Sequence, residues 1–357
     1  MLTREIFREA GRNLATGTSR MLVLATAAGA VMAALAAADG RAVAGLIDAN
    51  RTYQAQAATT WVVKAPGQID PAACESLNRL ANVTAAGAIK PADPGLTSGL
   101  LPRNPITRYL VTPAFTDLLD DFRTSGRPGL ILSSQVAAVL GAEVGQMIAL
   151  TGGQADVAGT YTYPDDGRTP GLGWAVLEPT NAQTGFDECW VGIAPDSAAV
   201  RALLATSARF TPGDQTSPQV TQLNSTLGPP ADQAAAFHAR QTSPAPAVAA
   251  TAAALIAAAA VWARRLELAA ARHARVPRLA SMVQLATEAA AWLALAAAAT
   301  APVIAHYAVH AGGLDTADVA WALARIPLAG FAAGMTAAFA TTTAVREKRL
   351  FTYFKTR

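Results

Sequence analysis

The chain has 357 residues, of which 52% are hydrophobic and only 15% are charged, with a formal net charge of +3. Soluble domains typically carry about 25% charged residues, so this composition excludes a disordered or nucleic-acid-coating chain and argues against a wholly soluble protein. Two cysteines and four histidines leave little material for a metal cluster. Membrane insertion is therefore the first hypothesis that the sequence raises.

Four segments with few or no charges are each 18 residues or longer: residues 21–38, 246–263, 283–309 and 319–345. A membrane-spanning helix needs about 20 mainly apolar residues, so we predict four transmembrane helices. Alanine dominates all four and favours insertion weakly, so the second segment alone could also be a buried helix of a soluble protein. Ala36 and Ala38 would fit a cleaved signal peptide. The long basic region before the first segment favours a retained anchor.

The charged residues between these segments differ in sign from one side to the other. Residues 1–20, 264–282 and 344–357 have net charges of +2, +4 and +4. Residues 39–245 have 13 basic and 18 acidic residues, and the link between the last two segments adds two Asp and no Lys or Arg. Because Lys and Arg concentrate in cytoplasmic loops, we predict cytoplasmic termini, a cytoplasmic loop at 264–282 and an extracytoplasmic domain at 39–245.

A basic amphipathic helix is predicted within residues 1–20, at the cytoplasmic membrane surface. Its apolar stripe is Leu2, Ile6, Ala10 and Leu14, and its basic stripe is Arg4, Arg8 and Arg12. Contact with a cytoplasmic partner is the alternative role for this helix. Residues 346–357 are predicted to form a basic cytoplasmic tail.

Residues 39–245 are numerous enough for one soluble domain with its own core. Short strands are predicted at residues 60–63, 83–89, 130–133, 147–150 and 156–162, and helices at 71–80 and 198–208. Asp70 is the expected N-cap of the first helix, with Pro71 at its first position. The mixture predicts an α+β fold. Adjacent carboxylates are expected to be solvated surface: Asp120-Asp121, Asp165-Asp166 and Asp187-Glu188.

Both cysteines, Cys74 and Cys189, fall in the predicted extracytoplasmic domain. Extracytoplasmic pairs in an oxidising compartment commonly form a disulfide. The alternative is two unrelated buried thiols. No histidine lies within ten residues of either cysteine, so a metal site is not expected there.

Residues 128–168 contain a predicted strand, a helix ending at Leu140-Gly141, a Gly145-Gln146 pair, a second strand, a Gly152-Gly153 turn and a final strand with Val157 and Gly159. This segment resembles the extracytoplasmic core domain of MacB-like permeases. The glycines suit points where the backbone leaves a helix or turns tightly.

The order of one span, a large domain and three further spans is similar to the FtsX-like permease domain, as is the loop RRLELAAARHARVPRLASMVQLATE. The loop looks like the family's ATPase-coupling segment, whose charged residues here are Arg264, Arg265, Glu267, Arg272, Arg275 and Arg278. Four of them, Glu267, Arg272, Arg275 and Arg278, are spaced to share one side of a short helix that could dock into an ATPase. The alternative is a cluster that only sets topology. Arg275 stands where the family commonly has glycine.

The resemblance implies an α-helical membrane protein with four transmembrane helices and an α+β extracytoplasmic domain inserted between the first and second. It implies the permease subunit of an ABC transporter of the mechanotransmission type, in the bacterial cell membrane, that exports or extracts a hydrophobic or peptide-like substrate. The sequence has no G-x-x-x-x-G-K-[ST] loop. We therefore expect no enzymatic activity here, and ATP and Mg on a separate ATPase.

Other expected partners are a second permease copy or paralogue, the lipid bilayer and an extracytoplasmic protein, but no nucleic acid. Two alternatives remain open: an FtsX-type activator of cell-wall hydrolases that transports nothing, and a membrane-anchored receptor without an ATPase.

Small residues form ridges in two predicted spans, around Gly29 and at Gly330 and Gly334. Such ridges allow close helix packing and are candidate dimer contacts, although an alanine-rich chain also produces them by chance. His306 and His310 have a spacing that can chelate a metal on a helix, but no third ligand is evident, so no metal is expected.

Overall fold

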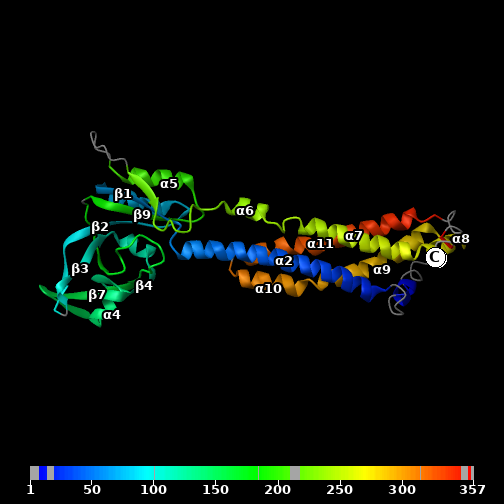
Figure 1. Ribbon diagram of the computed structural model, residues 1–357, viewed down its shortest axis with the longest axis horizontal. Coiled ribbons are helices and arrows are strands. Elements are labelled where there is room, and N and C mark those ends of the chain that lie inside the picture. Colours follow the sequence, from blue (N-terminus) through cyan, green and yellow to red (C-terminus); the bar gives the residue numbers. More distant parts are fainter. Residues whose placement is uncertain are drawn as a thin grey trace. The chain divides into compact units, whose positions relative to one another are not determined.

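The computed structural model describes residues 8–13, 20–99, 101–183, 185–209, 218–313, 315–346 and 353–354. The chain divides into two compact units. We call Met1–Ala49 with Asp232–Arg357 the helical unit, and Asn50–Ala231 the sheet unit. Each is described by itself, and Figure 1 labels their elements.

The described residues include four helices that are long and apolar enough to cross a membrane. They are α2 (Met21–Ala55), α7 (Ala245–Ala263), the pair α9 (Arg278–Ala298) and α10 (Ala301–Ala311), and α11 (Asp315–Ala344). Two short helices accompany them, α6 (Gln233–Ala239) and α8 (Arg265–His273), and residues 8–13 are also helical. The strands of the sheet unit fall between α2 and α7 in chain order.

Close packing of small residues holds the helical unit together. Helix α7 buries an alanine at every fourth position from Ala245 to Ala257, and it lies beside α11 (Figure 1). Residues spaced by four share one face of a helix, so this alanine stripe lets the two backbones approach closely. The side chain of Met32 of α2 packs against Gly330 of α11, where it occupies the space that a Cβ would need.

The predicted third span is not one continuous helix. Helix α9 ends at Ala298 and α10 begins at Ala301, with Pro302 in its first turn. Proline has no N–H to donate, so it is tolerated in the first turn of a helix. In the interior of a helix it removes a hydrogen bond, so the preceding helix ends before it. At the break, the carbonyl oxygen of Ala297 accepts both the backbone N–H of Thr300 at 3.0 Å and the hydroxyl of this buried threonine at 2.6 Å.

A ten-stranded mixed sheet forms the core of the sheet unit among its described residues. Its strands are β1 (Thr60–Ile69), β2 (Val83–Ser98), β3 (Leu101–Val111), β4 (Asp120–Thr124), β5 (Leu130–Ser133), β6 (Met147–Leu150), β7 (Gly153–Thr162), β8 (Ala175–Pro179), β9 (Phe186–Ile193) and β10 (Gln219–Gln222). The order is β10-β1-β9-β2-β3-β8-β5-β7-β4, and β6 pairs with β2 and β7. The β3–β8 and β5–β7 pairs are parallel and the others antiparallel.

Three short helices join the strands: α3 (Pro71–Ser76), α4 (Ser134–Leu140) and α5 (Ala198–Leu204). The predicted cap is present, since the Asp70 carboxylate accepts from the backbone N–H groups of Ala72 and Ala73. The helix predicted over 71–80 is shorter, because a 3-10 turn replaces its last part at Leu77–Arg79. Gly141 ends α4 with φ of 61°, the left-handed conformation that glycine adopts without strain.

Candidate functional site

Helix α8 follows α7 and precedes α9 along the chain. It lies within the predicted ATPase-coupling segment, residues 264–282. Leu268, Ala269 and Arg272 are buried, whereas Glu267, Ala270 and His273 are exposed. The helix thus has one face packed in the helical unit and one face toward solvent. Its first turn carries Glu267 and its last turn carries Arg272 and His273, which suits the helix dipole at both ends.

Arg264 joins the start of α8 to α9. Its guanidinium donates to Glu267 at 2.9 Å and also to Glu288, whose side chain is only 5% exposed. The amide of Asn13 donates to the other oxygen of Glu288 at 2.8 Å. The buried carboxylate is therefore paired and hydrogen-bonded from both sides, as a charge out of water must be.

Arg272 joins the end of α8 to the end of α11. Its guanidinium donates to the carbonyl oxygen of Thr342 at 2.7 Å and to that of Val345. The last carbonyls of a helix have no partner within the helix, and a cation there also suits the dipole. The expected common face is therefore wrong for Arg272, because its side chain is used inside the helical unit and not on the exposed face of Glu267.

The remaining charged residues of the loop stay accessible. Glu267, Arg275 and Arg278 are exposed, and Arg265 is half-buried beside Trp262. Of the six predicted coupling residues, Arg264 and Arg272 thus bond other helices of the unit. Glu267 lies on the exposed face of α8, whereas Arg275 and Arg278 are exposed beyond its end.

The three packing glycines all contact other helices of the same chain. A Cβ at Gly29 would lie 3.4 Å from the Ala296 backbone, and one at Gly334 would lie 2.8 Å from the Leu293 side chain. At Gly330 the neighbour is Met32. These positions therefore serve packing between α2, α9 and α11.

A buried ion pair that the sequence did not predict lies in the helical unit. Asp39 of α2 is fully buried and accepts from Arg240, which follows α6, at 2.8 and 3.2 Å. Thr242 donates a third hydrogen bond to Asp39 at 2.5 Å. The Arg240 guanidinium also lies 3.9 Å from the centre of the Phe237 ring. We call Asp39, Arg240 and Thr242 the clamp, since it fastens α2 to the segment before α7.

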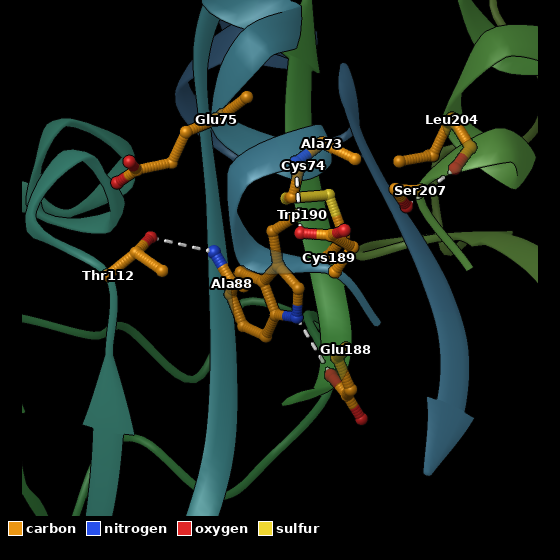
Figure 2. The surroundings of a disulfide bond; sticks show 12 residues. Ala73, Cys74, Glu75, Ala88, Thr112, Glu188, Cys189, Trp190, Leu204 and Ser207 are labelled. Atoms are coloured by element: carbon orange, nitrogen blue, oxygen red, sulfur yellow. Dashed lines mark hydrogen bonds between the residues drawn. A yellow bond between two sulfur atoms is a disulfide. The ribbon is translucent and has the colours of Figure 1, made fainter. Parts of the chain in front are cut away.

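The two cysteines of the sheet unit form the predicted disulfide. Cys74 of α3 is bonded to Cys189 of β9, and both are fully buried (Figure 2). The bond fastens α3 to one face of the sheet. Arg209 hydrogen-bonds the Asp70 carboxylate that caps α3, and this outweighs burial, so the pKa of Asp70 lies below its usual value.

Several predicted features fall outside the described residues. These are Leu2, Arg4, Ile6 and Leu14 of the amphipathic stripes and Lys348, Arg349, Lys355 and Arg357 of the tail. Within the described residues, no group of three or more His, Cys, Asp or Glu side chains could hold a metal ion. His306 and His310 stack at 4.2 Å, and a ring nitrogen of His310 lies 2.7 Å from the His306 carbonyl oxygen.

No protein-family model matches the sequence, and comparison with curated proteins gives no match. Among solved structures, the periplasmic region of MacB from Actinobacillus actinomycetemcomitans matches with a TM-score of 0.34 and 10% identity, over 46% of this chain and 89% of that chain. The extracellular domain of the ABC-type transporter YknZ from Gram-positive bacteria matches with a TM-score of 0.30 and 17% identity, over 45% and 99%.

Proposed function

We propose that this chain is the membrane subunit of an ABC transporter of the mechanotransmission type, which works with a separate ATPase. The observation that carries the proposal is the two-sided construction of α8. One face is fixed to the helical unit through Arg264 and Arg272, and the other presents Glu267 to solvent. A short helix held in this way is suited to receive force from a protein that docks on its exposed face.

The contacts of Arg264 and Arg272 determine which helices would move with α8. Arg264 bonds Glu288 of α9, and Arg272 bonds the last carbonyls of α11. Charge-assisted hydrogen bonds in a buried setting are among the stronger polar contacts in proteins. A displacement of α8 would therefore move the middle of α9 and the end of α11 with it.

Helix α2 is suited to carry motion away from the membrane. With 35 residues it is about 52 Å long, whereas a bilayer core is about 30 Å thick. The clamp fastens Asp39, in the middle of α2, to the segment that enters α7. In the proposed mechanism, this joint makes the two chain segments that lead to the sheet unit move together.

The remaining parts of the proposal follow from charge and from the resemblance to FtsX-like permeases. The basic loop at 264–282 and both termini face the cytoplasm, and the sheet unit is extracytoplasmic. The ATPase holds ATP and Mg, this chain has no enzymatic activity of its own, and a second copy or a paralogue completes the transporter. The substrate class is hydrophobic or peptide-like.

The direct test is affinity purification of the full chain from its native membrane in mild detergent, with partners identified by mass spectrometry. We expect an ATPase with a G-x-x-x-x-G-K-[ST] loop to co-purify. The double variant Arg275→Glu, Arg278→Glu should lower its recovery at least about tenfold, because reversed charges at an interface cost on the order of 1 kcal/mol or more each.

Arg127→Glu is the matched control, since Arg127 is an exposed arginine of the sheet unit. Recovery of the ATPase with this variant should equal that of the unmodified chain. Absence of any ATPase from the purified material would contradict the proposal and favour a receptor without an ATPase.

A further inference from the structure

A cavity of about 310 Å³ lies in the sheet unit. Side chains of β1, β9, β2 and β3 line it, and so do residues 169–172 of the connection between β7 and β8. Those four strands are consecutive neighbours in the sheet. The volume falls near the lower end of the range of about 300–1,000 Å³ that is typical of small-molecule sites.

Strand register explains why these side chains meet. Lys64 of β1 and Ile89 of β2 are both directly opposite Glu188 of β9, and Pro91 of β2 is opposite Tyr109 of β3. Residues directly opposite each other in neighbouring strands point to the same face of a sheet. All five therefore face the cavity, although they come from four strands spread over more than 120 residues of sequence.

Cys189 lies between two cavity residues, Glu188 and Trp190, and points to the opposite face. There it forms the disulfide with α3, as Figure 2 shows for the labelled residues. Strand β9, which supplies the cavity's indole and carboxylate, is thus held by a covalent bond on its opposite face.

Apolar side chains form part of the cavity wall. Trp190 is almost fully buried, its indole N–H donates to Glu188 at 2.7 Å, and its ring packs 5.2 Å from that of Phe115. The indole is therefore held in one orientation before any ligand arrives. Pro66, Pro91 and Leu172 complete the apolar lining. Aromatic and proline rings are good partners for another ring.

The charged groups of the lining balance one another. Lys64 pairs with Glu188 at 3.1 Å, Asp187 accepts from the backbone N–H of Gly67 at 2.8 Å, and Lys90 donates to the Gly185 carbonyl oxygen at 3.2 Å. With two ammonium groups and two carboxylates, the lining has no net charge. An uncharged ligand loses the least hydration on entering it.

One polar group is left to orient a ligand. The half-buried Tyr109 hydroxyl has no hydrogen-bond partner among the described residues. Burial, with a smaller contribution from Glu188, raises the pKa of Tyr109, so the hydroxyl stays protonated near neutral pH and remains a donor.

We propose that this cavity binds an uncharged aromatic group that carries a carbonyl oxygen, with its ring against the exposed Pro66 and Pro91 beside Trp190 and its carbonyl accepting a hydrogen bond from Tyr109. An aromatic residue within a peptide and a free aromatic amide share this chemistry. A saturated alkyl chain has neither the ring nor the acceptor. The site does not require the proposed ATPase, so its binding can be measured in the permease chain alone.

The test uses N-acetyl-4-fluorophenylalaninamide as the peptide-like probe and N-(4-fluorobenzyl)acetamide as the free aromatic amide. Fluorine NMR follows each probe with the full chain in phosphatidylcholine nanodiscs, and empty nanodiscs correct for partition into lipid. We expect saturable broadening of the probe signal. Preference for the first probe assigns the site to peptides, and equal or stronger binding of the second assigns it to free aromatic amides.

Tyr109→Phe keeps the ring and removes only the donor, so the dissociation constant should rise about 2- to 10-fold. Tyr53→Phe is the matched control, because the Tyr53 hydroxyl lies elsewhere in the sheet unit, where it bonds Gly228 and Gln222. Its dissociation constant should equal that of the unmodified chain. No saturable binding of either probe, or binding that Tyr109→Phe leaves unchanged, would overturn the proposal.

Discussion

Arg275 adopts the left-handed backbone conformation directly after α8, with φ of 61°. Its N–H donates to the Arg272 carbonyl oxygen and the N–H of Val276 donates to that of Ala271, each at 3.0 Å. These two bonds are the Schellman pattern that ends many helices, and glycine is the usual residue at this position because it has no Cβ to clash. The left-handed conformation thus gives a physical reason for the glycine that is common at this position in the FtsX-like pattern. Arginine, which has a Cβ, adopts the same conformation only with strain.

Replacing this arginine tests that reading. Arg275→Gly should raise the free energy of unfolding by up to about 1 kcal/mol, because the left-handed conformation costs a non-glycine residue about 1–2 kcal/mol. Arg278 is the matched control, since it begins α9 in a helical conformation. Arg278→Gly should lower stability by up to about 1 kcal/mol. Thermal unfolding of the full chain measures both, and a loss of stability in Arg275→Gly would refute the assignment.

Ion pairs between residues far apart in the sequence explain why the surroundings of some single residues could not be predicted. Asp166 is expected to be solvated, yet its side chain is only 17% exposed, while that of Asp120 remains 40% exposed. Both carboxylates bond the guanidinium of Arg168, whose side chain is only 2% exposed. Burial alone would raise the pKa of Asp166, but the hydrogen bonds from Arg168 outweigh it and lower the pKa. Asp120 and Arg168 are 48 residues apart, so no local pattern could reveal their contact.

Between elements, the clamp is the contact with the largest expected energetic effect. Asp39 is fully buried, and removal of Arg240 would leave its carboxylate without an opposite charge, with only the hydrogen bond from Thr242. Breaking a buried ion pair costs about 3–5 kcal/mol, whereas replacing both partners by apolar residues costs much less. Arg240→Met should therefore destabilise the full chain strongly, and the double variant Asp39→Leu, Arg240→Met should recover much of that loss. Additive effects in thermal unfolding would show that the pair does not act as a unit.

Element prediction succeeded where a local signal exists. Asp70 before Pro71 marked the start of α3, and Gly141 marked the end of α4. It failed for β9, whose last five residues are all buried, because a strand covered on both faces shows no alternation of apolar and polar residues. Strand β2 was predicted only to Ile89 but continues to Ser98 through Pro91 and Pro94, residues that ordinarily argue against a strand.

At the scale of the whole molecule, the spacing of charges and apolar runs predicts most of the architecture. Four apolar segments correspond to four described helices of sufficient length, and the strands fall between the first two. The candidate sites are harder to predict from the sequence. The inward positions of Arg264 and Arg272 depend on contacts with α9 and α11. The cavity of the sheet unit depends on the register of four strands. Only the complete fold determines these contacts and this register.

In the proposed assembly, an ATPase docks on the exposed face of α8. A photo-reactive benzoylphenylalanine placed at exposed Ala270 tests it most directly in native membranes, with the same residue at exposed Val139 of α4 as the control position. We predict that position 270 cross-links to an ABC ATPase and that position 139 does not. Failure of position 270 to capture an ATPase, with the chain present at its normal level, would contradict the account.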